Sequence, residues 1–412
     1  MDFSFGAEDE ELRGHARAWL SEHLVGPYAQ AVGLGGPGSE HEGAGIRRAW
    51  ERELGRGGWI GQGWEVDGWG NRRLSLTGQV VWAEEYAALR APGRVGHIGE
   101  NLLAPTLIAY GSPEQRDRFL PGIARGEELW CQGYSEPGAG SDLAGIRTAA
   151  VRDAADGLYR VTGQKIWTSL AHDADWCFVL ARTEPGSRRH RGLSFLLVRM
   201  DQPGRIEVRP IRQMSGTSEF DEVFFDGAVA AEVVGAEGDG WTVAMGLLAL
   251  ERGVSTLVQQ IGFAAELERV LASYVARAAS GAGDPVLRER LVRQWAELRT
   301  MRWNALRTLG ATGAASGPGG ASRAADAGAP SVAKLLWGGW HRRLGELAVE
   351  VRGAAATVGP ALWAPEVPYE HGLDEEQRLF LFTRADTIYG GSDEIQRNII
   401  AERVLGLPKE PR

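Results

Sequence analysis

The chain has 412 residues, 43% of them hydrophobic and 24% charged, which is ordinary for a globular protein long enough to form two or three domains. Its formal net charge of −9 argues against a general nucleic-acid binder, which usually carries a basic face. The two cysteines, Cys131 and Cys177, lack metal-ligand spacing and predict a reducing, cytoplasmic location without disulfides or a metal site. No apolar run is long enough for a membrane span, and the acidic N-terminus does not resemble a signal peptide.

The first third of the chain reads as helical. Amphipathic patterns occur at residues 8–25, 45–55, 75–92, 97–110 and 113–125. The last pattern has the clearest start, because Ser112 suits an N-cap, Pro113 fits the first helical position and Gln115 completes a capping box. We therefore predict an all-helical domain over residues 1–127.

The segment 26–45 is rich in glycine and proline and is predicted to be a loop. It contains the letters of a G-x-G-x-x-G motif at residues 33–38. No apolar strand pattern precedes this motif and Pro37 lies inside it, so the sequence lacks the strand–turn–helix context of a dinucleotide-binding site.

The pattern changes after Trp130. Short β-rich runs alternate with turns at residues 158–162, 176–182, 193–198, 206–211 and 223–225. No helical pattern separates these runs, which argues against a parallel, doubly wound sheet. We predict a small antiparallel, barrel-like β-domain over residues 128–238.

From Gly240 the pattern is helical again. Helices are predicted at residues 241–277, 285–309, 331–356 and 394–405, with a Gly/Ala/Ser-rich low-complexity link at 310–329. Long helices joined by loops are typical of an up-and-down bundle. We predict a C-terminal four-helix bundle over residues 239–412, so the fold class is mainly α with a central β-domain.

Two segments of the β-region combine glycines, hydroxyls and aromatic rings. They read Trp-Cys-Gln-Gly-Tyr-Ser-Glu-Pro-Gly-Ala-Gly-Ser-Asp-Leu-Ala-Gly at 130–145 and Thr-Gly-Gln-Lys-Ile-Trp-Thr-Ser at 162–169. Glycine lets a backbone approach a flat or phosphorylated ligand, because it has no Cβ. Either segment alone also fits an ordinary polar turn, in which the hydroxyls cap backbone groups. The ordered pair is more specific than either part.

This ordered pair is similar to the flavin-binding signature of the acyl-CoA dehydrogenases. The run Ile-Tyr-Gly-Gly-Ser-Asp-Glu-Ile-Gln-Arg at 388–397 is similar to the last active-site motif of that family, and the resemblance covers residues 8–408. It implies the same helix–β–bundle architecture, FAD as cofactor, an acyl-CoA substrate and electron-transfer flavoprotein or a similar acceptor. It also implies a homo-oligomer, a tetramer or dimer, with a heteromer as the alternative.

The resemblance assigns site residues one by one. The residues expected at FAD are Gln132, Tyr134, Ser135, Gly140, Ser141, Trp167, Thr168, Ser169, Ser392 and Glu394. Those expected at the substrate are Ser141, Gly390 and Gly391. Trp167 and the two hydroxyls after it would cover one edge of the isoalloxazine, with a hydroxyl near N5. Two family motifs are weaker here, the subunit-contact turn around 283–285 and the adenine turn at 352–356.

Glu251 is the candidate catalytic base. It falls inside an apolar stripe of the predicted helix, formed by Leu247, Val254, Val258 and Ile261. A carboxylate in an apolar wall must be paired, protonated or functional, and burial raises its pKa toward that of a general base. The plain alternative is an ion pair with Arg252 or Arg299.

The resemblance favours the catalytic role. Most family members place the base directly after the Ile-Tyr of the last motif, where this chain has Gly390. Members similar to the isovaleryl- and long-chain-specific enzymes instead place the base on the helix in a Leu-Glu-Arg context, which this chain has at residues 250–252. Glu251 would then remove the α-proton while the β-hydride passes to flavin N5. The backbone at Gly390 would help bind the thioester oxygen. Asp393 and Glu394 rank lower as bases.

Two other functions fit the same residues. The flavin could react with oxygen, as in related oxidases and monooxygenases. The chain could instead be a non-catalytic partner subunit that needs a second chain, to which the weak adenine turn at 352–356 gives weight. The intact flavin segments and Glu251 favour a dehydrogenase.

Overall fold

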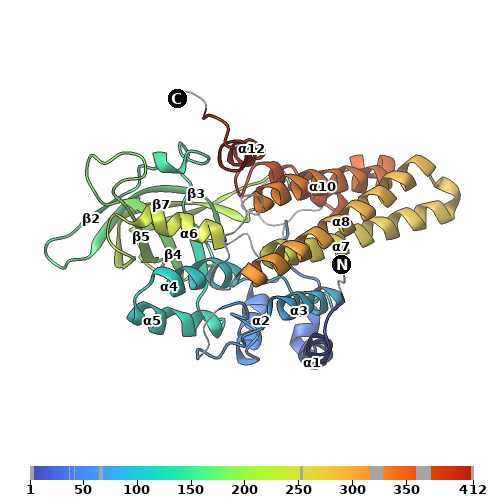
Figure 1. Cartoon of the computed structure of the whole chain (residues 1–412), viewed down its shortest axis with the longest axis horizontal. Helices are drawn as coiled ribbons and strands as arrows, with labels where there is room; N and C mark the ends of the chain where they lie inside the picture. Colours follow the sequence, from blue (N-terminus) through green and yellow to red (C-terminus); the bar gives the residue numbers. More distant parts are fainter. Residues whose placement is uncertain are drawn as a thin grey trace. The chain divides into compact units, whose positions relative to one another are not determined.

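The computed structural model describes residues 4–36, 38–40, 42–64, 68–250, 254–315, 328–358 and 373–409. The chain divides into two compact units (Figure 1). One unit combines residues 1–21 and 76–90 with 252–412, and the other combines 22–75 with 91–251. Each unit is therefore assembled from segments that are distant in the sequence.

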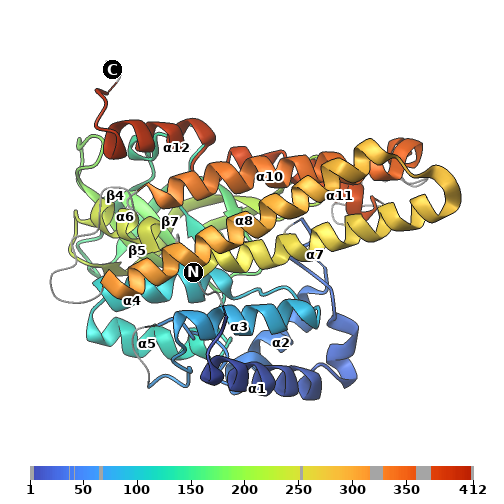
Figure 2. The same cartoon turned by 45° about the vertical axis from the view of Figure 1, so that its right-hand side comes forward.

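The first unit is helical throughout its described residues. Its helices are α1 (Ala7–His23), α3 (Leu76–Ala88), α7 (Val254–Arg277), α8 (Pro285–Ala315), α10 (Ala329–Arg352), α11 (Glu375–Phe382) and α12 (Asp393–Ile399). The long helices α7, α8 and α10 run side by side (Figure 2). This arrangement confirms the predicted helical bundle.

Apolar stripes hold the bundle together. Phe263 and Leu267 on α7 pack with Leu291 on α8 and with Trp340 and Leu344 on α10, and all of them are buried. The three- and four-residue spacings within a helix place such side chains on one face. Burying a large apolar side chain stabilises a fold by about 1.5–3 kcal/mol. The bundle therefore follows directly from the helical periodicity.

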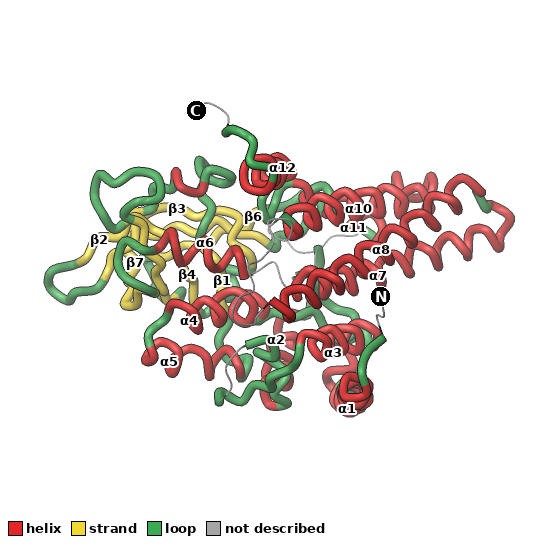
Figure 3. Tube along the Cα trace, in the orientation of Figure 1, coloured by secondary structure: helices red, strands yellow, loops and turns green. Residues whose placement is uncertain are grey.

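All the strands found among the described residues lie in the second unit (yellow in Figure 3). They are β1 (Trp130–Gly133), β2 (Ala149–Arg152), β3 (Tyr159–Ser169), β4 (Trp176–Arg182), β5 (Leu193–Arg199), β6 (Ile206–Ile211) and β7 (Phe220–Val234). Five strands pair in the cycle β4–β2–β3–β7–β5 and back to β4, which closes a small barrel, while β1 pairs with β4 and β6 with β7. The fold class predicted from the sequence is thus confirmed.

Helices cover one face of these strands. They are α4 (Ala104–Tyr110), α5 (Pro113–Ala124) and α6 (Gly240–Leu250), and α2 (Ala44–Arg56) belongs to the same unit. On β4, Phe178 and Leu180 pack into the core with these helices, whereas Cys177 and Val179 pack into a second core. Because side chains alternate along a strand, burial on both faces explains why β4 is apolar at nearly every position.

Several local predictions were wrong. The sheet is not purely antiparallel, because β1 and β2 both pair with β4 in parallel. The strands β1 and β2 and helix α11 were not predicted. The link predicted at 310–329 was placed too early in the sequence, because α8 continues to Ala315. Residues 316–327 of this link lie outside the described part of the chain. Residues 251–253 are also outside it, so the predicted helix 241–277 is described only as α6 and α7.

The predicted apolar stripe around Glu251 is not one surface. Leu247 on α6 is buried in the core beside the strands, whereas Ile261 on α7 packs with Val80 and belongs to the other unit. Val258 is 45% exposed. The stripe joins residues that belong to different cores, and it therefore no longer supports a buried position for Glu251.

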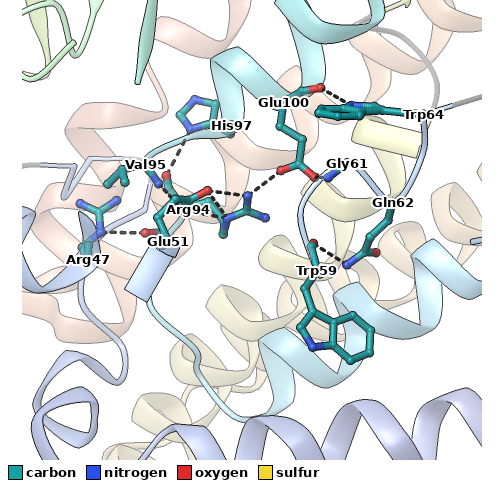
Figure 4. Close-up of polar contacts among 11 residues, drawn as sticks. Arg47, Glu51, Trp59, Gly61, Gln62, Trp64, Arg94, Val95, His97 and Glu100 are labelled. Carbon is teal, nitrogen blue, oxygen red and sulfur yellow. Dashed lines mark hydrogen bonds and ion pairs between the residues drawn. The ribbon is translucent and has the colours of Figure 1, made fainter. Parts of the chain in front are cut away.

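A buried ion-pair cluster fixes the loop after α2 (Figure 4). Arg94 Nη2 donates to Glu51 Oε1 at 2.5 Å and to Glu100 Oε2 at 2.6 Å, and the Gly61 N–H donates to Glu100 Oε1 at 2.7 Å. Burial raises the pKa of Glu51, but the Arg94 guanidinium outweighs it and lowers that pKa. The cluster therefore ties the Gly61 loop to the π-helical turn at Gly99–Leu103.

Candidate flavin and substrate site

A buried ion pair joins the two predicted flavin segments. Lys165 on β3 is fully buried, and its ammonium donates to Glu136 Oε1 at 3.0 Å and to the carbonyl oxygens of Tyr134 at 3.0 Å and Leu180 at 2.8 Å. All three ammonium protons therefore have acceptors. Burial lowers the pKa of Lys165 in spite of Glu136. The pair fixes the turn after β1 against β3.

The Glu136 carboxylate also accepts hydrogen bonds from the backbone. Its two oxygens accept the backbone N–H groups of Arg147 at 2.6 Å and Thr148 at 2.8 Å. Burial raises the pKa of Glu136, but Lys165 and these hydrogen bonds outweigh it and lower the pKa. The ionised carboxylate therefore closes the loop that carries Gly140 and Ser141, both of which are exposed.

The backbone of β3 breaks its register at the predicted isoalloxazine contact. The pairing with β7 shifts between Lys165 and Thr168, and Trp167 has φ 60. Positive φ is uncommon for a bulky residue and is often associated with a functional site. Trp167 is 56% exposed, and its ring makes an edge-to-face contact with Phe220 at a ring-centroid distance of 6.1 Å.

The residues present fit a flat polar cofactor. Thr168 is completely buried, yet its hydroxyl has no hydrogen-bond partner among the described groups. Ser135 lies beside β3 two residues before Thr168, because the Ser135 carbonyl oxygen accepts the Ile166 N–H at 2.9 Å. Gln132 on β1 and Ser169 at the end of β3 are half-buried. An exposed ring, an orphaned hydroxyl and partly open polar groups are what an isoalloxazine requires.

The C-terminal motif forms a tight turn in the other unit. Gly390 and Gly391 have φ 64 and 84, values that favour glycine. Gln396 Nε2 donates to both of their carbonyl oxygens at 3.2 Å. The Ser392 hydroxyl caps α12 by accepting the Ile395 N–H at 3.4 Å, which is the ordinary alternative to a cofactor contact.

The structure brings the predicted residues together in two groups. Gln132, Tyr134, Ser135, Gly140, Ser141, Trp167, Thr168 and Ser169 lie in the unit with the barrel, and Gly390, Gly391, Ser392 and Glu394 lie in the bundle unit. Glu394 is exposed and bonds to Arg397 Nη1 at 3.4 Å. Glu251 lies outside the described residues.

Glu136 and Lys165 were not predicted as site residues from the sequence. A signal was present, because Lys165 continues the inward face of Val161 and a lone lysine there needs a buried partner. The partner itself lies 29 residues earlier in the chain, so only the folded structure could identify it.

No helix in the described part of the chain combines the length and hydropathy needed to cross a membrane. In the same part, no group of three or more His, Cys, Asp or Glu side chains is arranged to hold a metal ion.

Comparisons with known proteins identify the family. Family models match residues 6–127 as the acyl-CoA dehydrogenase N-terminal domain, 131–228 as the middle domain and 238–405 as the C-terminal domain. The chain is 54% identical over 405 residues to acyl-CoA dehydrogenase IpdE1 of Mycobacterium tuberculosis, covering 98% of this chain and 99% of that protein. IpdE1 of Mycolicibacterium smegmatis is 53% identical over 414 residues, covering 98% and 99%.

Comparisons with solved structures point to the same family. The Tcur3481–Tcur3483 steroid ACAD matches with a TM-score of 0.80 and 28% identity, covering all of both chains. The ChsE4–ChsE5 complex from Mycobacterium tuberculosis matches with a TM-score of 0.76 and 30% identity, covering 99% of this chain and 100% of that one. The chain belongs to the acyl-CoA dehydrogenase family of FAD-dependent oxidoreductases.

Proposed function

We propose that the protein removes two hydrogens from Cα and Cβ of an acyl-CoA thioester, with Glu251 as the base. The observation that carries this proposal is the exposed Trp167 beside the orphaned Thr168 hydroxyl, in a chain whose three domains match one dehydrogenase family. Bound FAD would supply the acceptor for the β-hydrogen. The protein's own residues orient the cofactor and the thioester and move the α-proton.

The flavin would be held by the barrel unit. Gln132, Tyr134, Ser135, Gly140 and Ser141 would contact it from the turn after β1. Trp167, Thr168 and Ser169 would cover its other edge from the end of β3. The Glu136–Lys165 pair supports both segments, because it is buried and fully hydrogen-bonded. Ser392 and Glu394 are proposed contacts for the adenosine part, and Ser141 also for the pantetheine arm.

The C-terminal turn argues for a base elsewhere. Gly390 has φ 64, a backbone conformation that disfavours a side chain, and it occupies the position that carries the glutamate in most relatives. Glu251 in its Leu-Glu-Arg context is then the proposed base. The Gly390–Gly391 turn, in which Gly390 is exposed, would offer a backbone N–H to the thioester oxygen, where negative charge develops as the α-proton leaves.

The substrate class is proposed from the solved relatives. The steroid ACAD formed by Tcur3481 and Tcur3483 shares the fold along the entire chain. We therefore expect a bulky, steroid-derived acyl group to be preferred over a linear one. A linear acyl-CoA that reduces the flavin faster than any polycyclic acyl-CoA would contradict this assignment.

The assembly is proposed to be oligomeric. Val292, Trp295, Arg299 and Trp303 on α8 are spaced by three or four residues, so they share one face, and the three apolar ones are exposed. Arg299 lies over the Trp295 ring at 5.5 Å. An apolar face of this kind typically contacts another subunit. The partner is a second copy or a related chain, as in the ChsE4–ChsE5 complex.

One experiment separates the proposed function from its alternatives. The protein, purified with added FAD, is titrated anaerobically with linear and steroid-derived acyl-CoAs while flavin absorbance is followed. Bleaching by an acyl-CoA supports the dehydrogenase. Oxygen consumption without bleaching by any acyl-CoA favours an oxidase or monooxygenase. A colourless protein that binds FAD only with a second chain favours the partner-subunit alternative. Light scattering at 44.6 kDa with full FAD occupancy would contradict the oligomer.

A further inference from the structure

A chain of hydrogen bonds with a buried centre ends at Tyr389, which is 38% exposed and directly precedes Gly390. His341 on α10 is 2% exposed, and its Nδ1 lies 2.8 Å from Asp386 Oδ2, while its Nε2 lies 2.7 Å from Glu266 Oε2. The other oxygen of the completely buried Asp386 accepts the Tyr389 hydroxyl at 2.6 Å. The chain thus links α7, α10 and the C-terminal turn.

A second cation acts on the same segment. The Lys334 ammonium donates to the Asp386 backbone oxygen. It also lies 3.9 Å from the ring centroid of Trp337 and 4.7 Å from that of Tyr389, distances that allow cation–π attraction. A Cβ added to Gly390 would lie 3.7 Å from Lys334 Cε, so the turn rests directly against this side chain.

The charges of this cluster are complementary. Burial lowers the pKa of His341, but Glu266 and Asp386 outweigh it and raise the pKa to about 9. His341 is therefore a cation at neutral pH, and both of its ring N–H groups donate. Burial and Asp386 raise the pKa of Tyr389, which keeps its hydroxyl protonated as a donor.

The turn has no strand to hold it. Gly390 is exposed, and its carbonyl oxygen is bonded from the following helix by Gln396. Side chains therefore fix the turn from both sides, Tyr389 and Asp386 before it and Gln396 after it. A backbone donor contributes fully to transition-state stabilisation only when its direction is fixed in advance.

We propose that His341, acting through Asp386 and Tyr389, is a positioning residue that orients the Gly390 turn toward the thioester carbonyl. This inference rests on the proposed function for its catalytic part, whereas the ordering of the turn is independent of it. His341 touches neither substrate nor flavin in this scheme. It acts by fixing Asp386, which in turn fixes the residue before Gly390.

The same geometry makes the turn sensitive to alkaline pH. The titratable groups that bond to His341 are Glu266 from α7 and Asp386 from the C-terminal segment, whereas Tyr389 and Lys334 bond to Asp386. Loss of the His341 proton removes the donor to one of the two carboxylates. The buried Asp386 carboxylate and the half-buried Glu266 carboxylate then share one ring N–H, and the anchorage of Asp386 weakens.

Hydrogen exchange of residues 388–397 is the direct test, measured on the purified oligomer with and without FAD. His341→Gln and Tyr389→Phe are each expected to speed backbone exchange in this segment. Wild-type exchange, corrected for its intrinsic pH dependence, should accelerate as the pH rises through about 9, and this step should vanish in His341→Gln. Arg343→Gln is the matched control, because Arg343 lies on the same helix and pairs with Glu297 at the surface.

Flavin reduction supplies the second readout. A misplaced backbone donor should slow reduction by a saturating acyl-CoA by about 10- to 100-fold, with FAD content unchanged and Arg343→Gln at the wild-type rate. Wild-type protein that no acyl-CoA reduces would refute the proposed function, and the exchange data would still decide on the positioning role. Unchanged exchange in Tyr389→Phe, or an equal increase in Arg343→Gln, would overturn the inference. Tyr389→Phe decides the matter even where His341→Gln does not fold.

Discussion

The barrel unit and the bundle unit each carry some of the proposed site residues, and they hold these residues in different ways. In the barrel unit, a strand ladder carries Trp167 and Thr168, and the Glu136–Lys165 pair closes the neighbouring turn with every ammonium proton bonded. In the bundle unit, the Gly390 turn lies outside any ladder and depends on side chains such as Asp386 and Gln396.

Because of this difference, we expect the strand ladder to serve cofactor binding and the Gly390 turn to serve the reaction. A strand ladder fixes many backbone groups at once, which suits a cofactor that stays bound. A turn held by single hydrogen bonds can be tuned by the protonation of one side chain, and here that side chain is His341. Contacts to the flavin ring should therefore depend mainly on the barrel unit, and the alkaline limit of the reaction rate on the Gly390 turn of the bundle unit.

The largest expected effect is a loss of flavin reduction with FAD binding retained. Glu251→Gln keeps the side-chain shape and removes the base, so anaerobic flavin reduction by an acyl-CoA should fall by about 10²–10⁴-fold. FAD content should be unchanged, because the proposed flavin contacts lie elsewhere. Glu268→Gln, the same change at an exposed position of α7, is the control.

Two results would contradict this assignment. Near-normal reduction in Glu251→Gln would remove it as the base. A Glu394→Gln variant that binds FAD but is inactive would move the base to the C-terminal segment.

Breaking the buried pair should damage the barrel unit selectively. Lys165→Met leaves the Glu136 carboxylate buried without its cation, which typically costs about 3–5 kcal/mol of folding stability. The free energy of unfolding measured in urea and the affinity for FAD should both fall. Arg160→Met is the control, because Arg160 lies on the same strand and pairs at the surface with Asp153 at 3.1 Å. Equal losses in the two variants would show that burial of the pair is irrelevant.

The two units should respond oppositely to pH. The pKa of His341 is raised from 6.5 to about 9, so its stabilisation is complete below 6.5 and is lost as the pH rises through about 9. At about 1.4 kcal/mol per pKa unit, the loss is on the order of 3 kcal/mol. The pKa of Glu136 is lowered, so its stabilisation is present above 4.5 and is lost in acid.

Thermal unfolding from acid to alkaline pH measures both effects. His341→Gln should flatten the alkaline side of the stability profile and leave the acid side unchanged. An alkaline decline that persists in this variant would assign it to other groups.

The sequence predicted local structure better than tertiary partners. The capping box at Ser112 was predicted and is present, with the Gln115 N–H 3.2 Å from the Ser112 hydroxyl. The same signal at Asp374 and Gln377 begins α11 and could have revealed that helix. By contrast, β1 and β2 have four residues each, too few for a clear alternation. These strands and their parallel pairing required the fold itself.

In the candidate site, likewise, the motif residues were predicted from the sequence and their supporting partners were not. The ordered motifs singled out Trp167, Thr168 and the Gly390 turn, but only the structure shows the positive φ of Trp167 and Gly390 and the burial of Thr168. The supporting partners, Lys165 with Glu136 and His341 with Asp386, are separated by 29 and 45 residues. Such pairs depend on tertiary packing, and neither partner's sequence neighbourhood specifies the other.

The smallest expected effect tests the flavin assignment at a single atom. Thr168→Val removes a buried hydroxyl that has no hydrogen-bond partner among the described groups, so flavin-free stability should stay level or rise. FAD affinity should fall by about 2- to 10-fold, the value of one net hydrogen bond. Thr162→Val is the reciprocal control, because the Thr162 hydroxyl accepts the Gly227 N–H at 3.1 Å. That variant should lose stability and keep its FAD affinity. If calorimetric titration gave wild-type FAD affinity for Thr168→Val, the hydroxyl would not face the flavin, and the contact would have to come from Ser169 or a backbone N–H.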